Sequence, residues 1–215
     1  MPKCQFDSRR AEIKRNLSSL YARAQPIDIE DGEFWYATAQ HIVAEWAGTY
    51  RLYDTTVACV IAALSPQCEW TRNLIIADDI LAGRNPSIGG ALHACIRKAE
   101  ILRDTCGATL LLPIADRMRL VFPCGPKVNS FAQNLAGDMN VVTIDSHACQ
   151  AGLNDPTADY RLGWYPYSVF ADCYREMAHK VGRKPAVFQA ILWHTWKALY
   201  PRKAKNHVKR LERNR

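Results

Sequence analysis

Apolar residues recur at intervals of three and four along almost the whole chain, whereas alternation of apolar and polar residues is scarce. The first pattern places apolar side chains on one face of a helix, and the second is what a half-buried strand requires. We therefore expect an all-α protein. Helices are expected at residues 8–24, 31–48, 54–64, 70–83, 91–105, 113–120, 126–136, 146–153, 166–181 and 185–199, with a further one at 203–212.

The positive charge of the chain is concentrated at its C-terminal end. The formal net charge is +7, and the segment "PRKAKNHVKRLERNR" at 201–215 holds seven Lys and Arg against one Glu. A basic segment of this kind is an electrostatic footprint for a polyanion, with nucleic acid or an anionic membrane surface as the usual candidates. Tails of this composition also serve solubility alone.

The cysteine pattern and the hydropathy exclude several classes of protein. The eight cysteines include no C-x-x-C or other tight pair, so neither a zinc site nor an iron–sulfur cluster is indicated. We expect reduced, mostly buried thiols and no metal or other cofactor. No apolar run approaches a transmembrane helix, and the N-terminus lacks the apolar centre of a signal peptide. The sequence therefore predicts a cytoplasmic protein without membrane contact.

The segment "GPKVNSFAQNLAGDMNVVTID" (125–145) begins with a lysine at one helix start and ends with a carboxylate at another. Pro126 suits the first position of a helix, where its missing N–H would be unpaired in any case, so Lys127 is expected in the first turn. Free backbone N–H groups at such a start favour a phosphate oxygen. An ordinary helical turn with an exposed lysine fits the same pattern.

Asp145 follows the β-branched run "VVTI" and precedes "SHACQ", which is an N-cap arrangement. Hydrogen bonds from the first N–H groups of the helix would favour the ionised carboxylate. Such a carboxylate can stabilise positive charge that develops on a substrate. A plain structural N-cap is the alternative interpretation.

Four segments in this order resemble the helix-hairpin-helix DNA glycosylase superfamily, in its endonuclease III-like form. "VFPCGPK" resembles the family hairpin and ends at Lys127, and "IDSH" places Asp145 eighteen residues later, as in the bifunctional members. "ALSPQCEWTRN" (63–73) is similar to the family segment L-S-x-Q, and "RKAEIL" (97–102) to K-A-x-x-[IL]. Two departures stand out: Pro123 replaces the first hairpin glycine, and the C-terminal four-cysteine cluster is absent.

The resemblance implies a two-lobed helical fold with the active-site cleft between the lobes. A six-helix lobe containing the hairpin would span 50–143. Residues 1–49 and 144–200 would form the second lobe, and 201–215 a basic tail. The stretch "GRKPAVFQAILWHTWKALYP" has no clear counterpart in the family, and we interpret its Lys184, Gln189, Trp193, His194 and Trp196 as parts of one packed amphipathic helix.

The resemblance also implies a function and its residues. Asp145 would be the essential carboxylate, Lys127 the nucleophile, and Gln67 the residue that fills the gap left by an extruded base. Contacts to DNA would come from Ser65, Gln67, Pro123, Gly125 and Lys127, and the base pocket would include Trp70 and His147. The expected protein is a monomeric, metal-independent DNA glycosylase that excises a modified or damaged base from double-stranded DNA, with strand cleavage as a further activity.

Two other functions fit the same residues. A phage-type transferase that builds hypermodified thymines on a glycosylase-like fold would alter a base without excising it. A non-catalytic DNA-binding module would keep its binding without Lys127 and Asp145, and that binding would weaken steeply with salt. If a base is excised, the sequence leaves open whether the role is DNA repair, antiviral defence or modification of phage DNA.

Overall fold

The computed structural model describes residues 4–105 and 125–201. All regular secondary structure in these two ranges is helical, which confirms the expected all-α class. The elements are η1 (Asp7–Arg9), α1 (Arg10–Tyr21), α2 (Pro26–Tyr50), α3 (Asp54–Leu64), α4 (Trp70–Leu81), α5 (His93–Thr105), α7 (Pro126–Leu135), α8 (Ser146–Leu153), α9 (Trp164–Lys180) and α10 (Pro185–Leu199). The helices expected at 113–120 and 203–212 lie outside the described residues, as does nearly all of the basic tail.

Helix α2 begins five residues earlier than the expected range of 31–48. Pro26 occupies its first turn, and Gln25 forms a capping box with Asp28, whose carboxylate accepts the Gln25 N–H at 2.9 Å. Because these bonds satisfy N–H groups that a helix start leaves free, "AQPID" starts the helix instead of forming a separate turn.

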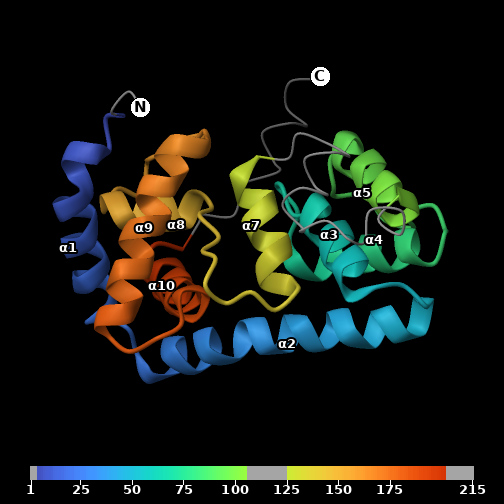
Figure 1. The fold of residues 1–215 in the computed structure, drawn as a ribbon, viewed down its shortest axis with the longest axis horizontal. Coiled ribbons are helices and arrows are strands. Elements are labelled where there is room, and N and C mark those ends of the chain that lie inside the picture. Colours follow the sequence, from blue (N-terminus) through green and yellow to red (C-terminus); the bar gives the residue numbers. More distant parts are fainter. Residues whose placement is uncertain (1–3, 106–124, 202–215) are drawn as a thin grey trace, which may run out of the picture.

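Two clusters of buried apolar side chains form the core. The first draws on α2, α3, α4, α5 and α7, and the second on α1, α8 and α9. Every residue of α3 from Thr56 to Leu64 is buried, which explains why this part of the helix is apolar on every side. Helix α2 runs along one side of both groups of helices (Figure 1). The expected lobe boundaries stay a prediction.

Helix α10 belongs to both clusters. Ala186 and Ala190 pack in the first cluster, and Phe188, Leu192 and Trp196 pack in the second. The helix also crosses α2 very closely, because a Cβ placed on Gly32 would lie 2.5 Å from the Ile191 backbone nitrogen. The missing side chain of Gly32 therefore sets how near the two helices come.

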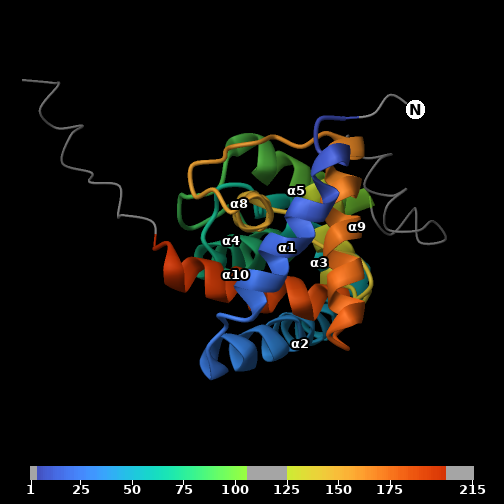
Figure 2. The ribbon, with the colours of Figure 1, turned by 90° about the vertical axis from the view of Figure 1, so that its left-hand side faces the viewer.

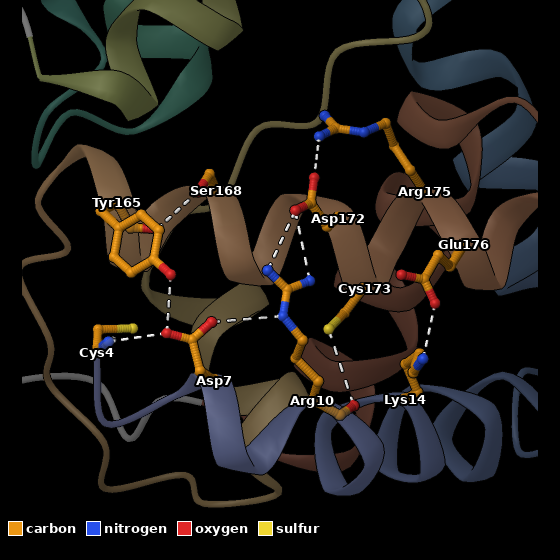
Figure 3. A network of polar contacts seen from close by, with 10 residues as sticks. All are labelled: Cys4, Asp7, Arg10, Lys14, Tyr165, Ser168, Asp172, Cys173, Arg175 and Glu176. Atoms are coloured by element: carbon orange, nitrogen blue, oxygen red, sulfur yellow. Dashed lines mark hydrogen bonds and ion pairs between the residues drawn. The ribbon is translucent and has the colours of Figure 1, made fainter. Parts of the chain in front are cut away.

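Helices α1 and α9 lie side by side (Figure 2), and polar contacts join them (Figure 3). The guanidinium of Arg10 lies 3.3 Å from Asp172, and Lys14 pairs with Glu176 at 2.7 Å. Near the start of α1, Asp7 accepts hydrogen bonds from the Cys4 backbone N–H and the Tyr165 hydroxyl. The Cys4 hydrogen bond is the main reason that the pKa of Asp7 is lowered. These exposed pairs orient α9 more than they stabilise the fold.

The six cysteines in the described ranges are free, and four of them are buried, as expected. None of the helices in these ranges is long and apolar enough to cross a membrane.

We predict that Gly32→Ala destabilises the protein although alanine is the better helix former. The added methyl group would clash with the backbone of Ile191, and overpacking of this kind costs about 1–3 kcal/mol. Gly48→Ala is the matched control, because Gly48 lies in the same helix with no atom within 4 Å of its added Cβ. The control should gain up to about 1 kcal/mol. Chemical denaturation of both variants measures the difference; equal stabilisation would refute the close crossing.

Candidate functional site

A pocket of about 270 Å³ opens where five helices meet. It is lined by Trp35 and Tyr36 of α2, Ser65 at the end of α3, Cys68 and Glu69 of the following turn, Trp70 and Asn73 of α4, Lys127 and Phe131 of α7, Thr143 and Asp145 before α8, and Gln189, Ala190, Trp193, His194 and Lys197 of α10. The pocket brings together residues separated by more than a hundred positions. Its volume is near the lower end of the range for small-molecule sites.

Lys127 lies in the first turn of α7, as predicted, because Pro126 and the N-cap Gly125 start the helix just before it. Its side chain is half-buried, and its Nζ donates a hydrogen bond to the Ser65 Oγ at 3.0 Å. Burial lowers the pKa of Lys127 below the ordinary lysine value, while the nearby Asp145 opposes that shift. A lowered pKa makes the neutral, nucleophilic amine easier to reach.

Asp145 is the N-cap of α8, also as predicted, and its Oδ1 accepts the Ala148 backbone N–H at 2.8 Å. Its second oxygen accepts the indole N–H of Trp193 at 3.0 Å. Two donors from different elements therefore fix the carboxylate, and it still lines the pocket.

Lys127 and Asp145 face one pocket, yet no direct ion pair joins these two residues. The amine is held by a hydroxyl and the carboxylate by a backbone amide and an indole. An amine and a carboxylate that are kept apart can act on two sides of a small group placed between them. This arrangement allows nucleophilic attack by one and charge stabilisation or proton acceptance by the other.

Asn134 holds the connection between α7 and α8 in place. Its Nδ2 donates to the carbonyls of Asp138 at 2.7 Å and Val141 at 2.9 Å, and its Oδ1 accepts the Thr143 hydroxyl at 2.7 Å. The side chain is completely buried. Because Asn134 lies two turns after Lys127 in α7, these bonds fix the path from one candidate residue to the other.

Tyr167 of α9 fixes the last residues before Asp145. Its buried hydroxyl accepts the Ile144 N–H and donates to the Val142 carbonyl, both at 2.9 Å. Burial is the main reason that the pKa of Tyr167 rises to about 12, so the hydroxyl keeps its proton at neutral pH. The segment 141–144, which leads into Asp145, thus forms hydrogen bonds with side chains of both α7 and α9.

Three aromatic rings form the apolar wall of the pocket. Trp35 lies 5.3 Å from Trp70 and 5.9 Å from Phe131, measured between ring centroids. All three residues line the pocket. Such rings favour a planar, apolar group.

Helix α10, which the sequence predicts only as a packed amphipathic helix, also lines the pocket. Gln189 is buried as expected, but Trp193, His194 and Lys197 also line the pocket. Burial lowers the pKa of His194, so its neutral form is favoured. The spacing of four residues between Gln189, Trp193 and Lys197 is the signal that these side chains share one face.

The remaining predicted site residues are distributed over three places. Gln67 is exposed in the turn between α3 and α4, with a left-handed backbone at φ 60°. Gly125 is exposed at the start of α7, and Pro123 lies outside the described residues. His147 is buried and lines a separate hollow beside Gln150 and Tyr200. The structure thus brings Ser65, Trp70, Lys127 and Asp145 into one pocket and leaves His147 out of it.

We predict that Asp145→Asn lowers the pKa of Lys127 further. The carboxylate favours the ammonium form, so its removal takes away the larger of the two influences that oppose the effect of burial on this pKa, the other being Cys95. A pH titration of the protein with ¹³C-methylated lysines, followed by NMR, measures this shift, and Lys127→Arg identifies the signal. An unchanged or raised pKa would contradict the electrostatic coupling of the two residues.

We predict that Asn134→Ala costs at least about 2 kcal/mol of stability, because it leaves buried hydrogen-bonding groups without partners. Thr143→Val removes one of the three side-chain bonds and should cost less. Urea denaturation of both variants gives the comparison. If Asn134→Ala lowers the free energy of unfolding no more than Thr143→Val does, Asn134 does not fix the connection between α7 and α8.

No curated protein and no solved structure matches the chain. Residues 2–199, which include every described residue of the pocket, match the family DUF7178, described as a family of unknown function. The chain therefore belongs to this family.

Proposed function

We propose that the protein is a DNA glycosylase that excises a modified base by breaking its bond to the sugar. The observation that carries the proposal is the shared pocket of Lys127 and Asp145, each at the start of a helix and each held by its own hydrogen bonds. The resemblance of the surrounding motifs to helix-hairpin-helix DNA glycosylases supports the same function.

The chemistry follows from the two residue types. Breaking the base–sugar bond builds positive charge on the sugar, which the carboxylate of Asp145 would stabilise. The neutral amine of Lys127 would bond to the anomeric carbon while the base leaves with the electron pair of the broken bond and takes up a proton that the amine loses. The nitrogen lone pair would then break the bond between the anomeric carbon and the ring oxygen of the sugar, and that oxygen would take up the remaining N–H proton. The Schiff base formed in this way gives a route to strand cleavage by elimination. Burial supports this role because it favours the neutral amine.

The pocket also suits a base taken out of the helical stack. Its wall of Trp35, Trp70 and Phe131 offers ring faces to a planar group. In this proposal Ser65, Gln67 and Gly125 contact the DNA backbone or the vacated position. The exposed positions of Gln67 and Gly125 leave both residues available for such contacts.

Borohydride trapping and abasic-site detection on a panel of duplexes test the proposal. The panel carries uracil, oxidised pyrimidines, 8-oxoguanine, and hydroxymethylated and glucosylated cytosines. We expect one substrate to give abasic sites and a trapped adduct, Asp145→Asn to reduce base release about 100-fold or more, and Lys127→Gln to abolish trapping.

Lys197→Gln is the matched control, since Lys197 lines the same pocket but is exposed and packs its ammonium over Trp193 at 3.8 Å. This variant should still be trapped. Full base release by Asp145→Asn would overturn the assignment of the carboxylate. Mass spectrometry of the treated DNA identifies the rival reaction, because a gain of mass without base loss would indicate a transferase.

A further inference from the structure

Asn73 of α4 is a buried side chain of the pocket with one unmet hydrogen-bonding atom. It is only 1% exposed, and it lines the pocket three residues after Trp70. Its Nδ2 donates to the Ile61 carbonyl at 3.0 Å, whereas its Oδ1 accepts no hydrogen bond. The amide nitrogen of Asn73 is therefore bonded to the backbone of α3, whereas the amide oxygen has no hydrogen-bond donor among the described residues.

The orientation of this carboxamide follows from its partner. The Ile61 carbonyl lies in the last turn of α3, where carbonyl groups lack a partner inside the helix. A carbonyl only accepts hydrogen bonds, so the amide nitrogen must face it and the Oδ1 must face away. A buried acceptor without a donor is unfavourable, because it has lost its hydrogen bonds to water and gained none in exchange. A ligand in the pocket that supplies the donor would remove this penalty.

A hydrogen-bond donor lies at the same end of α3. The Ser65 Oγ accepts from the Lys127 Nζ at 3.0 Å, which leaves the hydroxyl proton free to be donated. Ser65 follows Ile61 by one helical turn. This part of the pocket thus offers one acceptor and one donor beside the rings of Trp35 and Trp70.

We propose that Asn73 is a specificity-determining residue whose Oδ1 accepts a ring N–H of the molecule that enters the pocket. The ligand class is a planar nitrogen heterocycle with a ring N–H next to a carbonyl group, stacked on the aromatic wall. The inference rests on the proposed function, because it describes how the same pocket would recognise the extruded base. An interaction of this kind rejects an analogue that lacks the N–H, since the Oδ1 then stays unpaired.

Two small probes test this without a reaction or a known substrate. In 1-methyl-5-fluorouracil the ring keeps its N3–H, and in 1,3-dimethyl-5-fluorouracil a methyl group replaces that hydrogen. Titrations of the full chain followed by ¹⁹F NMR give both dissociation constants. We expect the first probe to bind about tenfold or more tightly than the second. The side-chain NH₂ signal of Asn73 should shift with the first probe only.

Asn73→Leu keeps the shape of the side chain but cannot accept a hydrogen bond, so the preference between the probes should disappear. If the preference came from a clash with the added methyl group, it would persist in this variant. Gln189→Ala is the matched control, because it removes another buried carboxamide of the pocket, whose oxygen already contacts the Tyr36 hydroxyl at 3.4 Å. This control should keep the preference.

Equal affinity for the two probes, or binding of neither, would overturn the role of Asn73. If Asn73→Leu fails to fold, the side-chain NH₂ signal of Asn73 in the wild-type protein still tests the proposal, because it should shift with the first probe only. Base release from the duplex panel is measured separately. If bases are released but the two probes bind equally well, the proposed function stands and the role of Asn73 is wrong. If the probes are distinguished but no base is released, the pocket binds the heterocycle and the proposed function is not supported.

Discussion

The close crossing of α2 and α10 at Gly32 is the constraint on which the two-part core depends. Helix α10 sends side chains into both apolar clusters, so its distance from α2 sets how the clusters meet. The pocket is built around the same crossing, because Trp35 and Tyr36 follow Gly32 by one turn and Gln189 precedes Ile191. The crossing that packs these two helices thus also places residues of the candidate site.

The second constraint is the fixed path between α7 and α8. Lys127 and Asp145 occupy the first turn and the N-cap of consecutive helices. Asn134 and Tyr167 bind the connecting segment from two helices, so the backbone that leads into Asp145 is fixed relative to α7 and α9. In the proposed reaction both residues act on one substrate group, which a direct ion pair between them would hinder.

Local patterns predicted the helices well and the pocket only in part. The helices at 54–64, 146–153 and 185–199 follow from uninterrupted periodicity between clear turn signals, and Lys127 and Asp145 follow from capping chemistry. The early start of α2 depends on the hydrogen bond that the Gln25 backbone N–H donates to the Asp28 carboxylate. The contributions of Trp193 and Asn73 depend on how distant helices pack, and periodicity alone carries no such information.

Peptide mapping of the borohydride-trapped adduct tests most directly whether this pocket is a reaction centre. The wild-type protein is trapped on the active duplex, digested with protease and nuclease, and sequenced by mass spectrometry. The account predicts a sugar remnant on the ε-amine of Lys127 and on no other lysine. A remnant on Lys197, on a lysine outside the pocket, or on the N-terminal amine would contradict the assignment of this pocket as the site of the reaction.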